Sequence, residues 1–542
     1  MKLVKQIGAI LLVCALVLSF SACGGKSGSS DALNIMIEVE VQSLDAQVAT
    51  DGTSFEVIAN CVDGLKQMDA NGGAIDALCA KEEVSADGLI YTFTIRDDAF
   101  WSNGDPVTAA DFVFGWQRAC DPAIEYSYMM SDVGQIKNAA AIIEGTMPAS
   151  ALGATAVDEK TLKVELEVPV AYFDSLLYFP TFYPVNQKFF EECGDTYATS
   201  PETILSNGAY IMKTFEPAAT SFTLEKNENY YDADKIKIAT LNYQVIKESQ
   251  QALLSYQNGD LDIILLSGDQ VDQVKDDKEF TSVGAGYLWY ISANMAQYPE
   301  LANLNMRKAM MFAIDRQTIV DNVVKDGSTA TFTAVPPQFA TGPSGDDFSA
   351  DQEEFKDLCA FDAAKAKEYY EAAKTELGKS TFEFEMIVDD TEIQQKVAAV
   401  VKEQLETTFE GMTITLKVEP KKQRVLDMQE GNFCLGLTRW GPDYADPMTY
   451  LGMWVTGNSN NYGLWSNAEY DAIIEKCTTG DLKGDPAGRW SALKDAEKIA
   501  LEECVIFPIY TQCNANMISS KVSGIEFHPV ALNRVYKNAT KE

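Results

Sequence analysis

The chain has 542 residues, of which 46% are hydrophobic and 23% are charged, so it can bury substantial cores and should divide into more than one domain. Eighty acidic residues against 43 basic ones give a formal net charge of -37, which repels nucleic-acid phosphates and excludes nucleic acid as the expected partner. The single histidine, His528, excludes zinc sites that need two imidazoles.

The N-terminus has the pattern of an exported protein. Two lysines precede an apolar run over residues 7–20, which is shorter than the roughly 20 residues of a membrane-spanning helix. The sequence S-A-C-G-G that follows resembles the lipobox of bacterial lipoproteins, whose cysteine, here Cys23, becomes the lipidated N-terminus. We therefore expect a signal peptide over residues 1–22 and a flexible Gly/Ser-rich tether over residues 23–30. The alternative is an ordinary secretory cleavage site beside an incidental cysteine.

Nine cysteines remain after the signal peptide and Cys23 are set aside, and none forms a C-x-x-C pair. Their scattered spacing argues against a zinc ribbon or a dense disulfide scaffold, and an odd number cannot all pair internally. We expect most of them to be small apolar core residues.

The first strong element pattern lies near residue 90. Residues 89–101 read as a strand whose alternation breaks at Asp97-Asp98, and a turn at 103–106 precedes a helix that begins near residue 108. The aromatic residues of this stretch favour packing over ligand contact. They are Phe100, Trp101, Phe112, Phe114 and Trp116.

Two further patterns indicate α/β architecture. A helix starting at residue 249 is closed by Asn258-Gly259 and followed by an apolar strand that ends at 266. Later, strands over 382–388 and 413–418 enclose a helix over 391–409, which predicts a βαβ unit with parallel strands. These patterns together favour two α/β lobes.

Several motifs of the mature chain form a specific succession. They include D-G-L at 63–65, W-S-N-G-D-P-V-T-A-A-D-F at 101–112, S-N-G-A-Y at 206–210, M-R-K-A-M-M-F-A-I-D-R at 306–316 and R-W-G-P-D-Y-A-D-P at 439–447. In this succession the sequence resembles the oligopeptide- and dipeptide-binding lipoproteins of bacterial ABC importers, the extracellular solute-binding family 5.

The resemblance implies an α/β, type II periplasmic-binding-protein fold with two hinged lobes and an extra domain inserted in the first lobe. The motif order gives lobe I as residues 31–62, 181–286 and 512–542, the inserted domain as 63–180, and lobe II as 287–511. The lobes are expected to close over a ligand by a hinge where the connecting strands cross, near residues 286 and 511.

The resemblance also implies the main ligand contact. Asp443 stands where peptide-binding members hold an aspartate against the free α-ammonium of the ligand, and a carboxylate in a closed cleft pairs strongly with an ammonium. The alternative is a turn residue, since Gly441-Pro442-Asp443 is also a typical loop composition. Its neighbours Trp440 and Tyr444 are further candidates, with Trp440 as a pocket wall or, alternatively, a core residue.

Other candidate contacts follow from the same likeness. Tyr128 resembles a tyrosine that contacts peptides, although Tyr126 competes for that position. Asn294, Thr50 and Asp51 also fall where the family lines its cleft. At Thr50 some peptide binders carry a glutamate, and its absence leaves room for another solute class. A ligand carboxylate would need a cation, and Arg439, Arg424 and Lys421 stay open for this role.

The implied function is the capture of oligopeptides between the lobes and their delivery to the permease of an ABC importer. We expect a monomer outside the cytoplasm, anchored through the lipid on Cys23 to the bacterial cytoplasmic membrane, or a periplasmic protein. We expect no enzyme activity, cofactor or metal, since the sequence has no G-x-S-x-G, H-E-x-x-H, Walker or G-x-G-x-x-G motif. The alternatives are a non-peptide solute, a sensory or adhesive role on the same fold and, less favoured, a secreted acidic hydrolase.

Overall fold

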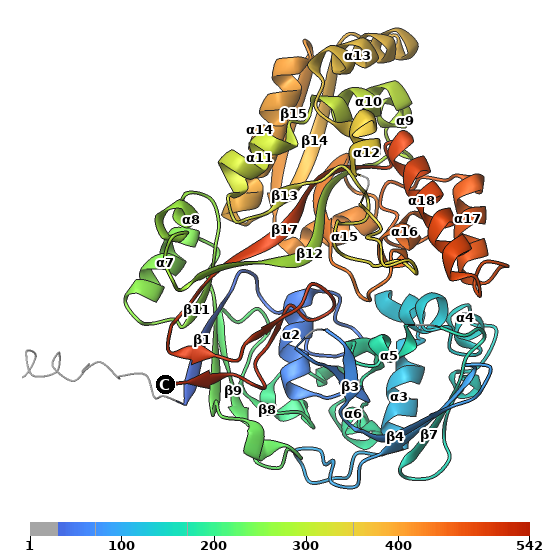
Figure 1. The fold of residues 1–542 in the computed structure, drawn as a ribbon, viewed down its shortest axis with the longest axis vertical. Helices are drawn as coiled ribbons and strands as arrows, with labels where there is room; N and C mark the ends of the chain where they lie inside the picture. Colours follow the sequence, from blue (N-terminus) through green and yellow to red (C-terminus); the bar gives the residue numbers. More distant parts are fainter. Residues whose placement is uncertain (1–30, 71, 171, 351) are drawn as a thin grey trace, which may run out of the picture.

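The structure is a computed structural model, and it describes residues 31–542 except residues 71, 171 and 351. The expected signal peptide, the tether and Cys23 lie outside these residues. Figure 1 shows two α/β lobes, one above the other, and a further domain beside the lower lobe. Two long strands, β12 (Phe280–Ala293) and β17 (Ile506–Ile518), run between the lobes.

The lower lobe in Figure 1 contains a five-stranded part of the main sheet. Its strands are β1 (Ala32–Ile37), β8 (Tyr210–Thr214), β9 (Ser221–Lys226), β10 (Thr240–Val245) and β11 (Ile263–Leu266). Its helices are α2 (Gly52–Cys61), α7 (Ser249–Gln257) and α8 (Asp269–Val274). β1 pairs in parallel with β10 and β11, so its apolar side chains are buried. The helix and strand predicted over residues 249–266 are α7 and β11.

The further domain is built on an antiparallel sheet in the order β4-β5-β7-β6. These strands are β4 (Cys79–Val84), β5 (Ile90–Ile95), β6 (Ala154–Ala156) and β7 (Thr161–Glu165), and the hairpin β2 (Lys66–Met68) with β3 (Ala74–Asp76) precedes them. Its helices are α3 (Ala109–Ala119), α4 (Ala139–Ile143) and α5 (Phe173–Leu176), and α6 (Gln187–Cys193) follows.

Helix α3 begins where the sequence predicts, because Thr108 and Asp111 form a capping box. Trp101 and Trp116 are buried, as expected, whereas Phe100 is 40% exposed, so its prediction as a packing residue is wrong. The strand before α3 also ends earlier than predicted, at Ile95.

The upper lobe contains the predicted βαβ unit. Its strands β14 (Phe382–Asp389) and β15 (Met412–Glu419) pair in parallel, and helix α14 (Glu392–Thr408) connects them. The strand β16 (Leu435–Trp440) continues the sheet toward β12. The other longer helices are α10 (Leu304–Ala313), α12 (Gln352–Cys359), α13 (Ala363–Leu377), α15 (Lys421–Gln429), α17 (Ala468–Thr478) and α18 (Pro486–Glu502).

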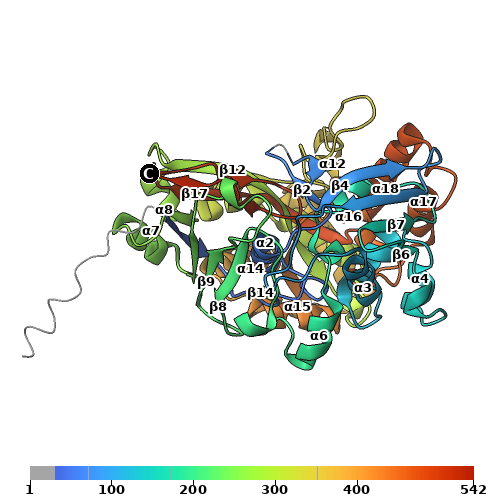
Figure 2. The ribbon, with the colours of Figure 1, turned by 90° about the horizontal axis from the view of Figure 1, so that it is seen from below.

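One mixed sheet passes through both lobes in the order β15-β14-β16-β12-β17-β11-β1-β10-β9-β8, and the short strand β13 (Thr329–Ala330) pairs with β17. Figure 2 shows β12 and β17 running side by side along one face of the molecule. Their antiparallel pairing covers residues 280–284 and 288–292 of β12 and is interrupted between Gly284 and Leu288. This break lies at the predicted hinge, while the domain boundaries given above stay a prediction.

All nine cysteines in the described part of the chain are free thiols. Seven of them are buried, as expected for small core residues, and the exceptions are Cys193 and Cys513. Among residues 31–542, apart from the three omitted positions, no helix combines the length and the apolar character that crossing a membrane requires.

Candidate ligand-binding site

Neighbouring cavities that share lining residues lie between the two lobes. The cavity that we call the wide cavity has a volume of about 410 Å³ and lies between Tyr128 in the inserted domain and residues 440–479 of the upper lobe. The cavity that we call the narrow cavity, about 90 Å³, is lined by Thr50 and Asp51 from the lower lobe, by Tyr287 at the strand break, and by lobe II residues. Trp440 and Asp443 line both cavities, so the two form one cleft.

Asp443 lies on the loop that follows β16 and is only 4% exposed. The hydroxyl of Tyr128 donates a hydrogen bond of 2.8 Å to Oδ2 of Asp443, and the Asp443 N–H donates to Oγ1 of Thr449 at 3.0 Å. No lysine, arginine or histidine in the described chain forms an ion pair with this carboxylate. Burial raises the pKa of Asp443 to about 7, although hydrogen bonds from Tyr128 and Tyr126 limit the rise. A carboxylate in this setting is suited to bind an ammonium group.

Both tyrosines considered for the same role meet at this carboxylate. Tyr128 lines the wide cavity and Tyr126 lines the narrow one, with their ring centroids 5.3 Å apart. Burial raises the pKa of each phenol well above its ordinary value, so both stay neutral hydrogen-bond donors. The sequence did not decide between Tyr126 and Tyr128, and in the structure both tyrosines flank the Asp443 carboxylate.

Trp440 and Tyr444 form aromatic walls. Trp440 is 9% exposed, and its Nε1 is buried with no hydrogen-bond partner in the described chain. A buried donor without a partner is costly, so this N–H is available to a carbonyl of a ligand. Tyr444 stacks on Tyr172 of the inserted domain, with ring centroids 4.9 Å apart. This stacking joins the upper lobe to the inserted domain beside the cleft.

Tyr287 fills the space between the lobes at the strand break. A Cβ atom on Gly52 would lie 2.3 Å from the Tyr287 hydroxyl, and one on Gly441 would lie 2.3 Å from its ring. The two glycines, one from each lobe, therefore admit this ring by having no side chain. Sequence reasoning missed Tyr287, although the Gly-Tyr pair inside a strand pattern is a signal of close backbone approach.

Thr50 and Asp51 line the narrow cavity, as expected. The Asp51 carboxylate already caps helix α2 by accepting from the N–H groups of Thr53 and Ser54, and Lys421 Nζ lies 3.7 Å away. Asn294 is different, because it is fully buried and lines none of the described cavities of the cleft. Its amide donates to the carbonyl groups of Gly431 and Phe433, which gives it a structural position away from the ligand space.

All three candidate cations line the narrow cavity, but their partners differ. Arg424 is buried against Asp389, with Nε donating to Oδ1 at 2.8 Å, so its charge is already paired. Lys421 lies near Asp51, and burial lowers its pKa. Arg439 lines the narrow cavity and two smaller neighbouring cavities, and it forms no ion pair with a carboxylate of the described chain. Its guanidinium donates to Oε1 of Gln512 at 3.0 Å and lies 4.4 Å from the centroid of the Tyr287 ring.

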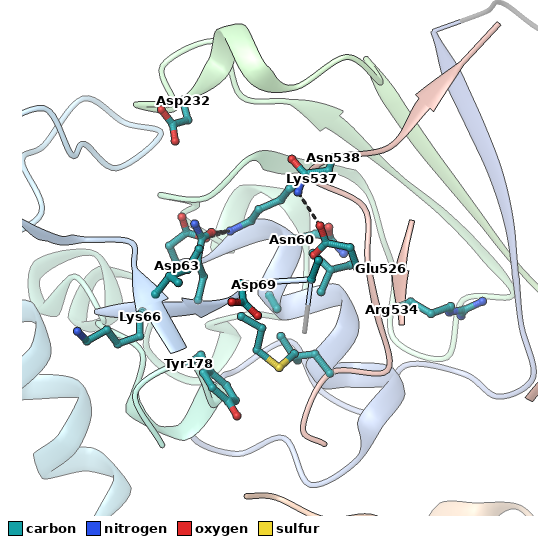
Figure 3. Close-up of a pocket in the computed structure, with 18 of the residues that line it drawn as sticks. Asn60, Asp63, Lys66, Asp69, Tyr178, Asp232, Glu526, Arg534, Lys537 and Asn538 are labelled. Carbon is teal, nitrogen blue, oxygen red and sulfur yellow. Dashed lines mark hydrogen bonds and ion pairs between the residues drawn. The ribbon is translucent and has the colours of Figure 1, made fainter. Parts of the chain in front are cut away.

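A separate cavity of about 350 Å³ lies in the lower lobe, away from the cleft (Figure 3). Figure 3 shows Lys537 extended toward Asp63, with which it forms an ion pair. Arg534 pairs with Glu56 at 2.9 Å, and Lys66 pairs with Asp76 and Glu82. Because these cations are already paired, this cavity is less suited than the cleft to bind a charged ligand. No group of three or more potential ligand side chains in the described residues could hold a metal ion.

Comparison with known proteins identifies the family. A model of the bacterial extracellular solute-binding proteins, family 5, middle region, matches residues 74–462, which is more than half of the chain. The chain belongs to this family. It is therefore a member of a family of extracellular solute-binding proteins, and the family expected from the motif order is confirmed.

Relatives of this family 5 protein cover nearly its whole length. A dipeptide-binding protein of Lactococcus lactis subsp. cremoris is 33% identical over 99% of this chain and 100% of the relative. The oligopeptide-binding protein OppA of Bacillus subtilis is 31% identical over 97% of each chain. A structure of Listeria monocytogenes OppA bound to peptide matches with a TM-score of 0.88 at 33% identity, over 95% of this chain and 99% of the other. The expected two-lobed fold is confirmed.

Proposed function

We propose that this family 5 protein captures oligopeptides between its two lobes and anchors their free α-ammonium on Asp443. The observation that carries the proposal is a buried carboxylate, without a cation in the described chain, at the junction of two cavities. Leaving such a charge unpaired is unfavourable, and an ammonium of the ligand supplies the missing partner. The names of the relatives support peptides as the ligand class.

The remaining groups of the cleft suit a peptide backbone. The unpartnered Nε1 of Trp440 donates to a peptide carbonyl, and Arg439 receives a carboxylate of the ligand beyond the narrow cavity. Closure of the lobes around the break in β12 removes water from these contacts and strengthens them. Most of this recognition uses groups that every peptide carries, so it permits varied sequences.

The cellular role follows from the same proposal. Export by residues 1–22 and lipidation of Cys23 hold the protein at the outer face of the cytoplasmic membrane, where it delivers peptides unchanged to an ABC importer permease. Uptake of radiolabelled peptides by a strain that lacks the protein separates transport from a sensory role, since only transport requires the protein for uptake.

The Asp443 anchor is tested with matched peptides. Asp443→Asn is expected to weaken binding of a free-amine tripeptide by about 30-fold or more, because removal of one partner of a buried charge pair costs about 2–5 kcal/mol. The N-acetylated form of the same tripeptide is expected to lose less than about threefold. Titration calorimetry measures both losses, and equal losses would remove Asp443 from the ammonium site.

A further inference from the structure

The wide cavity extends from Asp443 away from the narrow cavity. It lies between the helical turn Met129–Val133 of the inserted domain and the segment from Met448 to helix α17 in the upper lobe. Its volume of about 410 Å³ is in the range of pockets that enclose small ligands. A ligand held at Asp443 can therefore place one long side chain in it.

The charged residues of the wide cavity are all acidic. Asp132, Asp443, Asp471 and Glu475 line it, and no lysine or arginine is among its described lining residues. Asp471 accepts hydrogen bonds from the N–H and hydroxyl of Thr456, but it has no cationic partner in the described chain. A cavity with low-dielectric walls and charges of one sign concentrates the field and attracts the opposite charge.

One buried polar atom in the walls points independently to a ligand. Asn460 lines the wide cavity and is 3% exposed, and its Oδ1 has no hydrogen-bond partner in the described chain. An unpartnered amide oxygen requires an N–H donor, which a guanidinium or ammonium supplies.

The rest of the wall suits the stem of such a side chain. Met448, Met453 and Ile474 are buried and provide an apolar surface, and Trp440 and Tyr444 provide aromatic rings. Lysine and arginine side chains bury their methylene groups against apolar surface while the charged end stays near polar groups. Aromatic rings add attraction for the cation.

We propose that the wide cavity receives the side chain of the first residue of the peptide and selects lysine or arginine at that position. This inference rests on the proposed function, because Asp443 must hold the α-ammonium at the junction of the two cavities. The backbone then runs through the narrow cavity toward Arg439, and the first side chain enters the wide cavity on the other side.

The test compares three tripeptides with free amino groups: Arg-Ala-Ala, citrulline-Ala-Ala and Glu-Ala-Ala. Citrulline has nearly the shape of arginine without its charge, so the first pair isolates the charge. The protein is expected to bind Arg-Ala-Ala about tenfold more tightly than citrulline-Ala-Ala, and Glu-Ala-Ala more weakly than both. Titration calorimetry at constant ionic strength gives the three affinities.

A double variant locates the preference in the wide cavity. Asp132→Asn with Glu475→Gln removes two lining carboxylates, neither of which forms an ion pair in the described chain. It is expected to reduce the ratio of the Arg-Ala-Ala affinity to the citrulline-Ala-Ala affinity to about threefold or less. The matched control, Asp276→Asn with Glu403→Gln, changes the net charge equally at exposed positions outside the described cavities and should keep the full preference.

The outcomes separate the two proposals. Equal binding of all three peptides, or an equal loss of preference in both double variants, overturns the wide-cavity inference and leaves the Asp443 anchor standing. Absence of binding by all three peptides overturns the proposed function, and the inference with it. Thermal unfolding of each variant, compared with the unmodified protein, identifies any loss that is due to misfolding.

Discussion

The Asp443 carboxyl group is buried without a cation, so its ionisation is unfavourable in the unliganded protein. Its pKa is raised from an ordinary 3.8 to about 7. A raised pKa in the folded state means that this group favours folding below about pH 4, and that the benefit is lost as the pH rises through about 7. The peptide ammonium offsets this loss by supplying the missing charge.

Replacing Asp443 should flatten the dependence of stability on pH. When the pH rises from 4.5 to 7.5, the free energy of unfolding of the unliganded, unmodified protein is expected to fall by about 2–4 kcal/mol more than that of Asp443→Asn. Urea unfolding at the two pH values measures this difference. Parallel pH profiles for the two proteins would mean that Asp443 ionises freely and is not held in a closed cleft.

At this scale the motif at 439–447 predicts Asp443, Trp440 and Tyr444 as ligand contacts, and all three line the wide cavity. The sequence could not choose among Arg439, Arg424 and Lys421, because the choice depends on partners that are distant in the chain. Arg424 pairs with Asp389, which lies 35 residues away. Asn294 was assigned to the cleft by the family likeness, yet its amide donates to backbone carbonyl groups 137 and 139 residues away.

At the scale of elements, helix α18 is tied to the segment after β13 by one buried carboxylate. Glu497 on α18 is fully buried, and its Oε1 accepts from the N–H groups of Ala334 and Val335 at 2.7 and 2.9 Å. Burial raises the pKa of Glu497 to about 7. The carboxyl group thus satisfies two backbone donors that would otherwise be buried without a partner.

Two substitutions separate the hydrogen bonds of Glu497 from its charge. Glu497→Gln keeps an acceptor oxygen and should change the free energy of unfolding at pH 8 by about 1 kcal/mol or less. Glu497→Leu leaves two buried N–H groups unpaired and should cost about 2–5 kcal/mol. Guanidinium unfolding at pH 8 measures both values. Equal stability of the Leu and Gln variants would contradict the anchoring role.

Sequence patterns correctly predicted those helices and strands whose bounds depend on residues that are near one another in the chain. The βαβ unit formed by β14, α14 and β15 follows from alternating strands around an amphipathic helix, and α3 follows from its capping box. The strand predicted over 89–101 ends at Ile95, shortly before the Asp97-Asp98 pair that interrupts its alternation. The row of cavities in the cleft could not be predicted, since it depends on how separate segments meet.

At the scale of the whole molecule, Gly286 lies at the hinge with a positive φ of 71°. A Cβ atom there would lie 2.0 Å from the carbonyl oxygen of Pro529 in lobe I and 3.1 Å from Pro442 in lobe II. A side chain at this position would therefore clash with Pro529 inside lobe I and press against Pro442 of lobe II, where the two lobes meet.

We expect Gly286→Ala to weaken peptide binding by at least about tenfold. The control is Gly259→Ala, which shares a positive φ but has no atom within 4 Å of the added Cβ. Both variants carry the backbone strain of alanine at positive φ, and Gly286→Ala must also displace the Pro529 carbonyl, so it should lose more stability than the control. Equal peptide affinities for the two variants would show that close packing at the hinge is not needed for closure.

At this scale we expect the lobes to close on a peptide whose ammonium contacts Asp443. The most direct measurement is a crystal structure of the protein with a bound free-amine tripeptide. We predict the peptide nitrogen about 3 Å from the Asp443 carboxylate, with the backbone in the narrow cavity. A peptide bound elsewhere, or bound in the cleft with its amino group turned away from Asp443, would contradict this account.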